Sequence, residues 1–280
     1  MQDIEALTAS EMAIMTALAN FRYLTTPQVV KLGVSPSVRH VQRVMRRLMD
    51  RARPLVGGLE HGAIPTIGRL HRIHFLTERG ATILEDGGQP WETIHFPRKA
   101  RLFPHDYWHR IDCVDFHIAL ARWAMMTGAS IDFFHTYYDH GKIGSDGRAY
   151  PRSRVSWGDD ALVPDAMFQI TGADGVARLC AFEMHKGADT GRLTPKLKTY
   201  LEACRAQALE DCYGYRKSAR VLLVFDQKAP LERLRERLAR DGLLQDRGAQ
   251  FFGKTLAEVA TDFRVNWWPL DGHTTPSSLF

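Results

Sequence analysis

Two acidic residues in a predicted β-hairpin, residues 162–186, are the first candidates for chemistry. The two strands are rich in β-branched, aromatic and aliphatic residues, and a Gly-Ala-Asp-Gly turn separates them. Because Pro164 belongs at the start or the edge of a strand, Asp165 lies at the mouth of the first strand. On the second strand, the side-chain period of two places Glu183 and His185 on one face. Asp165 and Glu183 either share a hard cation, Mg²⁺ or Mn²⁺, or serve structurally as a turn cap and the partner of an arginine.

The composition is that of an ordinary globular protein. The chain has 280 residues, 45% of them hydrophobic, which suits one large domain or two smaller ones. No apolar run approaches the roughly 18 residues that a membrane helix needs, and the first residues lack a signal-peptide pattern. The four cysteines form no C-x-x-C pair, so zinc and redox motifs are excluded and reduced thiols are expected. These features predict a cytoplasmic protein without a membrane partner.

Positive charge is concentrated in the N-terminal third of the chain. Residues 1–104 contain 14 Lys and Arg against 9 Asp and Glu, whereas residues 105–280 contain 23 of each. The whole net charge of +5 therefore belongs to the first of these segments. A basic segment of this kind indicates a polyanionic partner.

The N-terminal third has the element order of a winged helix-turn-helix domain. Apolar spacing predicts three helices, the second and third of which open with a Thr-Pro or Ser-Pro pair, over residues 10–21, 26–32 and 35–51. Two strands, 54–59 and 69–76, then form a wing, and a Leu-Thr-x-x-Gly-x-x-x-Leu run follows, as it often does in winged-helix proteins. In such a domain the third helix is suited to the major groove of DNA.

This third helix carries the candidate DNA contacts. Between Ser35 and Arg53 there are six basic residues and one acidic residue, which favours DNA contact over a merely solvated charged face. The candidates for base contacts lie near the start of the helix and are Arg39, His40, Gln42 and Arg43. The candidates for phosphate contacts lie further along and are Arg46, Arg47 and Arg51. The predicted partner is double-stranded DNA.

The remaining two thirds alternate helices and strands. A Gly- and Pro-rich linker is expected over 89–104 and a flexible tail over 271–280, so the predicted domains are 1–88 and 105–270. Between linker and tail, the pattern predicts a helix over 105–127, a strand over 131–138, a long polar loop over 139–160, the hairpin, a helix over 190–207, a strand over 219–225, an amphipathic helix over 231–238 and a closing segment over 251–268.

The order helix, strand, hairpin, helix and strand is that of the restriction-endonuclease-like αβββαβ core, the PD-(D/E)xK type. The motifs in that order are His109-Arg110-Ile111-Asp112-Cys113-Val114-Asp115, Trp157, Pro164-Asp165-Ala166, Phe182-Glu183-Met184-His185-Lys186-Gly187 and Lys196-Leu197-Lys198-Thr199-Tyr200, with Phe21-Arg22-Tyr23-Leu24-Thr25-Thr26 in the N-terminal third. With these residues, over about residues 10–225, the chain resembles the replication-relaxation family, which includes mobilisation relaxases related to restriction nucleases. The resemblance implies a mixed α/β protein, a winged helix followed by a nuclease-like domain.

The resemblance also implies a set of metal ligands. In the nuclease relatives an acid from the first helix of the core, the Pro-Asp acid and the strand glutamate surround a metal ion. Here these positions correspond to Asp115 or Asp112, to Asp165 and to Glu183. The implied ligands of Mg²⁺ or Mn²⁺ are therefore Asp165, Glu183 and Asp115.

The sequence departs from the nuclease pattern at one position. A lysine is expected two residues after Glu183, but His185 stands there and Lys186 follows it. Both residues belong to the predicted catalytic group. The role of the lysine passes to Lys196 or Lys198 on the next helix, or catalysis is lost and the domain only binds.

Two functions remain open at this stage. The first is a metal-dependent nuclease or relaxase that nicks or cleaves DNA in plasmid or mobile-element replication or transfer. The second is a DNA-binding regulator or accessory protein whose degenerate nuclease-like domain forms a homodimer or recruits replication or transfer proteins. An apolar stripe left exposed on the helix over 231–238 would favour the second function.

Overall fold

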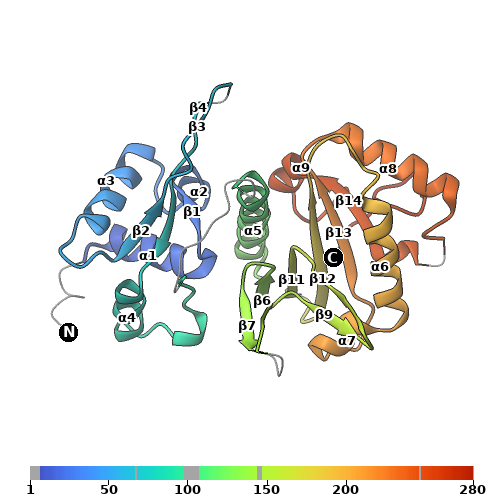
Figure 1. Ribbon diagram of the computed structural model, residues 1–280, viewed down its shortest axis with the longest axis horizontal. Helices are drawn as coiled ribbons and strands as arrows, with labels where there is room; N and C mark the ends of the chain where they lie inside the picture. Colours follow the sequence, from blue (N-terminus) through green and yellow to red (C-terminus); the bar gives the residue numbers. More distant parts are fainter. Residues whose placement is uncertain (1–6, 67, 98–106, 144–146, 246, 280) are drawn as a thin grey trace. The chain divides into compact units, whose positions relative to one another are not determined.

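The computed structural model describes residues 7–66, 68–97, 107–143, 147–245 and 247–279 (Figure 1). The chain folds into two compact units, Met1–Ile118 and Ala119–Phe280. Helix α5 (Tyr107–Thr127) begins in the first unit and ends in the second. Each unit combines helices with strands, so the predicted mixed α/β class is confirmed.

The first unit surrounds a small antiparallel sheet with helices. Its elements before α5 are α1 (Ala9–Phe21), β1 (Leu24–Thr25), α2 (Thr26–Lys31), α3 (Val38–Met49), β2 (Val56–Leu59), β3 (Ala63–Ile64), β4 (Gly68–Arg69), β5 (Ile73–Leu76), α4 (Glu78–Asp86) and the 3₁₀ turn η1 (Trp91–Thr93). The sheet has the order β1-β5-β2, and β3 and β4 extend the β2–β5 hairpin away from it (Figure 1). The core is made of buried apolar side chains, including Ile14, Leu18, Val41, Met45, Leu48, Ile73 and Leu76.

Side-chain caps set where the second and third helices begin. The hydroxyl of Thr25 accepts the N–H of Gln28, and the Gln28 side chain accepts the N–H of Thr25 at 2.9 Å, which is a capping box. Helix α3 is capped by Ser37, whose hydroxyl accepts the N–H of His40 at 3.2 Å. Ser35, the residue expected to open this helix, lies two residues earlier, and its hydroxyl accepts the N–H of Ser37 at 3.3 Å.

The predicted linker is in part a packed segment of the first unit. Ile94 is buried, and the N–H of His95 donates to the carbonyl of Ala19 in α1 at 2.9 Å. The rest of the predicted linker, residues 98–104, lies outside the described residues. The first turns of α5 also belong to this unit, so its boundary is Ile118 and not residue 88.

The second unit is built on a six-stranded sheet. After α5 its elements are β6 (Ser130–Thr136), β7 (His140–Ile143), β8 (Ala149–Pro151), β9 (Val155–Trp157), β10 (Asp160–Leu162), β11 (Ala166–Thr171), β12 (Ala177–His185), α6 (Leu193–Arg205), α7 (Ala208–Tyr213), β13 (Arg220–Phe225), α8 (Lys228–Asp241), η3 (Gly248–Gln250), β14 (Phe251–Thr255), α9 (Leu256–Thr261) and β15 (Trp268–Pro269). The order is β15-β14-β13-β12-β11-β6. Strands β12, β13 and β14 run parallel, while β6, β11 and β15 are antiparallel to their neighbours.

One face of this sheet packs against α6, α7 and α8 (Figure 1). The strands contribute alternate residues, as the period of two requires, and these include Leu179, Ala181, Val221, Leu223 and Phe225. The apolar stripe of α8, made of Leu231, Leu234 and Leu238, is buried in the same cluster. This stripe is therefore not left exposed.

The predicted polar loop over 139–160 contains the short strands β7, β8 and β9. The carboxylate of Asp139 accepts both the N–H and the hydroxyl of Thr136, which closes the turn after β6. The hydroxyl of Ser153, fully buried, donates to the carbonyl of Pro164 at 2.7 Å. These bonds attach the segment to the start of β11.

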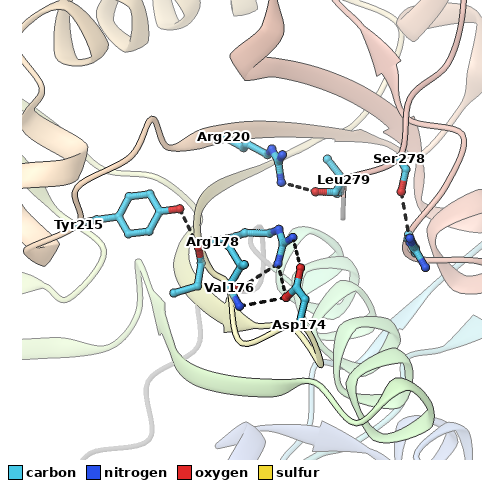
Figure 2. Close-up of polar contacts among 9 residues, drawn as sticks. Asp174, Val176, Arg178, Tyr215, Arg220, Ser278 and Leu279 are labelled. Atoms are coloured by element: carbon cyan, nitrogen blue, oxygen red, sulfur yellow. Dashed lines mark hydrogen bonds and ion pairs between the residues drawn. The ribbon is translucent and has the colours of Figure 1, made fainter.

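The described part of the predicted flexible tail, residues 271–279, contacts the rest of the second unit at two points. Ser277 forms a β-bridge with Trp267, and Leu279 is fully buried. The guanidinium of Arg220 on β13 donates to the carbonyl of Leu279, as Figure 2 shows. Apolar burial and this hydrogen bond hold the C-terminal residues against the sheet, which local composition did not indicate.

Candidate functional site

Asp165 and Glu183 lie side by side at one end of the sheet. The antiparallel register ends with Ala166 on β11 opposite Phe182 on β12, so Asp165 directly precedes one residue of this pair and Glu183 directly follows the other. The negative charge of Asp165 acts on the Glu183 carboxyl. This end is also where the parallel strands β12, β13 and β14 finish, and ligands of α/β sheets bind outside these carboxyl ends.

The backbone of the neighbouring strand orients Asp165. One carboxylate oxygen accepts the N–H of Met184 at 2.7 Å, and the side chain is buried. The carbonyl of Asp165 accepts the N–H of Tyr137 at 3.1 Å. Asp165 therefore joins β12 to the turn after β6.

Glu183 is held by two residues of α6. The ammonium of Lys196 donates to one carboxylate oxygen, and the hydroxyl of Tyr200 donates to the other at 2.5 Å. Lys196 and Tyr200 are four residues apart, so they lie on one face of the helix. The partner of Glu183 is thus a lysine and not the arginine considered above.

Electrostatics strongly perturb the carboxyl of Glu183. Burial, followed by the negative charge of Asp165, raises the pKa of Glu183 to about 8, although Lys196 and Tyr200 act in the opposite direction. Burial and the neighbouring Glu183 also raise the pKa of the Tyr200 hydroxyl well above its usual range. Two adjacent carboxyls in such an environment need a positive partner, and Lys196 supplies one.

The surroundings of Glu183 are closed. Leu193, Leu197 and Leu223 line the space beside it, together with Lys196 and Tyr200, and that space has no room for a water molecule. The side chain of Lys196 is 37% exposed, so its ammonium reaches the acid from the surface. Access to Glu183 therefore requires Lys196 to move.

His185 lies two residues beyond Glu183 and is buried beside Phe225, with the ring centroids 5.2 Å apart. Neither ring nitrogen of His185 has a hydrogen-bond partner among the described residues. Burial, followed by the positive charge of Arg192, lowers the pKa of this imidazole. Lys186 lies just past the strand and is half-buried, with its carbonyl accepting the guanidinium of Arg192 at 3.0 Å. The negative charges of Asp226 and Asp189 and the backbone of Gly187 act on the pKa of His185 in the opposite direction.

The candidate DNA contacts of α3 divide into two groups. The first group has no side-chain hydrogen bond or ion pair within the described chain, and it consists of Arg39, His40, Gln42, Arg43 and Arg46. All of these side chains are exposed except that of His40, which is half-buried. They are free to meet a ligand.

Arg47 and Arg51 form the second group, because both pair with Glu11. The guanidinium nitrogens of Arg47 and Arg51 lie 3.0 and 3.6 Å from the Glu11 carboxylate, which is buried. Burial alone would raise the pKa of Glu11, but hydrogen bonds from Thr8 and the charge of Arg47 hold it below its ordinary value. These two arginines therefore join α3 to α1.

Asp115 has its partners within the first unit. Its carboxylate accepts the amide of Gln28 at 2.9 Å and the ammonium of Lys31. The same Gln28 amide donates to the carbonyl of Ile111 at 3.0 Å. Asp115 thus fastens α5 to α2, a role that sequence spacing did not suggest.

Two parts of the site were not assigned roles from the sequence. Tyr200 entered the sequence analysis only as the last residue of the motif that begins at Lys196, although its spacing of four from Lys196 is a usable signal. Arg69 and Arg72 were placed on predicted strands, and their shared partner Glu60 lies nine and twelve residues before them. The turn geometry that brings these three together cannot be derived from spacing alone.

No protein-family model, curated protein or solved structure matches this chain. Among the described residues, no helix has the length and apolar content needed to cross a membrane.

Proposed function

We propose that the protein binds double-stranded DNA through a winged-helix first unit and cleaves or nicks DNA through a restriction-endonuclease-like second unit. The observation that carries the proposal is the pairing of Asp165 with Glu183 at the carboxyl ends of the parallel strands, with Lys196 beside them. This is the activity that the resemblance to the replication-relaxation family implies, and it would serve plasmid or mobile-element replication or transfer.

The order of elements in the second unit supports the nuclease-like part. Helix α5 is followed by β6, the β11–β12 hairpin, α6 and β13, and these strands are neighbours in the order β6-β11-β12-β13. With the short strands β7–β10 and helix α7 set aside, this order supports an αβββαβ core. The two acids fall on the two strands of the hairpin, at the same end.

The first unit supports the DNA-binding part through its shape and charge. The order α1, α2, α3 and then a β-hairpin is that of a winged helix, and the exposed face of α3 carries unpaired basic residues. Such a helix is suited to the major groove of duplex DNA. Counterion release by its arginines would supply much of the affinity.

The donor set fits a hard divalent cation. Asp165 and Glu183 offer adjacent carboxylates, and each carboxylate oxygen has two lone pairs, so it can accept a hydrogen bond and ligate a metal ion. These two residues would hold Mg²⁺ or Mn²⁺, which acts as a Lewis acid on a phosphate oxygen when bound. Asp115 is left out of this set because Gln28 and Lys31 hold its carboxylate.

The chain's own residues supply the remaining roles. Lys196 stands in for the lysine absent from position 185, because its ammonium already lies against Glu183. There it would stabilise negative charge that develops on the phosphate. His185, buried at the end of β12 with a lowered pKa, would position the attacking water.

The test uses the full chain with supercoiled plasmid and Mn²⁺. Wild type is expected to convert the plasmid to the nicked or linear form, and Asp165→Asn, Glu183→Gln and Lys196→Met are expected to abolish conversion while duplex binding is kept. Asp174→Asn is the matched control, because Asp174 lies exposed at the turn of the same hairpin and pairs with Arg178 (Figure 2). Cleavage that survives Asp165→Asn would rule out the proposed site.

The closed space beside Glu183 favours a second candidate, a non-catalytic DNA-binding regulator or accessory protein. In that case the Glu183–Lys196 pair replaces the metal, and the second unit forms a homodimer or recruits replication or transfer proteins. The buried stripe of α8 does not offer a surface for this, since Leu231, Leu234 and Leu238 lie in the core. Thermal melting with Mn²⁺ separates the two candidates, because a cation bound by the folded state raises the melting temperature.

A further inference from the structure

A groove lies between α3 and the β2–β5 hairpin of the first unit, with a volume of about 510 Å³. Its walls include Gln42 and Arg46 from α3 and Glu60, Arg69 and Arg72 from the hairpin. None of these hairpin residues belongs to the predicted DNA contacts. The groove therefore extends the basic face of α3 onto a second element.

Glu60 bridges the two arginines of the hairpin. One carboxylate oxygen accepts the guanidinium of Arg69 at 3.0 Å, and the other accepts the guanidinium of Arg72. The hydrogen bond from Arg72, followed by the charges of Arg69 and Arg72, holds the pKa of Glu60 below its ordinary value, so the carboxylate is ionised near neutral pH. Ion pairs as exposed as these contribute little to stability, so stability alone does not explain the bridge.

The side chain of Arg72 is positioned by the backbone. A Cβ at Gly58 would lie 2.7 Å from Cδ of Arg72, so the arginine side chain packs directly over this glycine. A guanidinium nitrogen of Arg72 also lies 3.8 Å from the sulfur of Met49 on α3. The side chain of Arg72 thus reaches from the hairpin across the groove to α3.

We propose that this groove holds a sugar–phosphate strand of duplex DNA, with Arg46, Arg69 and Arg72 as phosphate contacts and Glu60 as an internal anion that the phosphate displaces. The inference rests on the proposed DNA binding and adds the surface that holds the backbone and the acid that limits its affinity. Three guanidinium groups along one open groove match a repeating phosphate chain. Because Glu60 opposes every polyanion equally, it lowers the affinity for all duplexes alike, and the ratio of specific to non-specific binding stays with the base contacts of α3.

The test measures binding of the full chain to a fluorescent duplex of random sequence over a series of salt concentrations. Glu60→Gln is expected to tighten binding about fivefold at low salt, the size of one surface charge interaction with a phosphate. The double variant Arg69→Ala/Arg72→Ala is expected to reduce the slope of log affinity against log salt by about 2, which is about 0.9 for each lost phosphate contact.

Glu85→Gln is the matched control, since Glu85 is an exposed acid on α4 and removes the same charge away from the groove. If Glu60→Gln behaves like Glu85→Gln and the arginine variants keep the wild-type slope, the groove assignment is overturned while DNA binding stands. If wild type does not bind duplex DNA, the proposed function fails and this inference fails with it. Circular dichroism of each variant confirms that the fold is retained.

Discussion

Replacement of Lys196 by methionine is expected to destabilise the protein by an amount that grows with pH. Lys196 pairs with Glu183, whose side chain is only 5% exposed. The pKa of Glu183 is about 8 in the folded protein, above the value of about 4.5 for a solvated carboxyl. Below the folded pKa the carboxyl is protonated, so the loss of Lys196 removes a hydrogen bond worth about 1 kcal/mol.

Above that pKa the loss of Lys196 removes the partner of a buried charge. The raised pKa means that wild-type stability falls as pH rises from about 4.5 to about 8 and then levels off. Without the ammonium the pKa of Glu183 moves higher, so stability continues to fall by up to about 1.4 kcal/mol for each further pH unit. Solvent screening at the Lys196 ammonium, with its side chain 37% exposed, makes that figure an upper bound.

Urea denaturation of the full chain at about pH 6 and about pH 9 measures both costs. We expect Lys196→Met to lower the free energy of unfolding by about 1 kcal/mol at the lower pH and by about 2 kcal/mol at the higher pH. Lys198→Met, an exposed position on the same helix, should show neither cost. In a Glu183→Gln background the Lys196→Met cost should lose its pH dependence. Equal costs at both pH values in the wild-type background would refute the reasoning.

Three further predictions concern the fold. Burial, followed by the charge of Arg72, lowers the pKa of His74 to about 4, so the unfolded state takes up a proton first as pH falls below about 6.5. Stability should therefore fall by up to about 3 kcal/mol between these pH values, and His74→Leu should remove that loss in acid titrations followed by circular dichroism. Leu279→Ala should cost about 2–4 kcal/mol in urea, because Leu279 is fully buried; a flexible tail would show no cost. Gly57→Ala should destabilise the protein, since its Cβ would lie 2.3 Å from the ring of Phe75. A Gly57→Ala/Phe75→Leu double variant should recover most of the lost stability. If the losses of the two single variants simply added, this contact would be contradicted.

The sequence alone determined the elements that local pattern controls. The helices over 10–21 and 105–127 and the strand over 219–225 lie within a few residues of α1, α5 and β13, because apolar periodicity and caps are local properties. The β11–β12 hairpin follows from the turn residues between its strands. The pairing of Asp165 with Glu183 follows from that hairpin, because strand register carries the acids to one end.

Only the tertiary structure decided which residues surround the acids and the basic helix. Lys196 and Tyr200 reach Glu183 because α6 packs on the sheet face that Glu183 shares, and packing of this kind depends on contacts between distant segments. For the same reason, the Asp115 carboxylate contacts Gln28 and Lys31, and the Arg47 guanidinium contacts Glu11. The C-terminal residues have a loop-like composition, yet the burial of Leu279 and its bond to Arg220 order them. Local sequence pattern indicates which secondary structure a segment prefers. Ion pairs and the burial of the C-terminal residues depend instead on which distant residues the fold brings within a few ångströms.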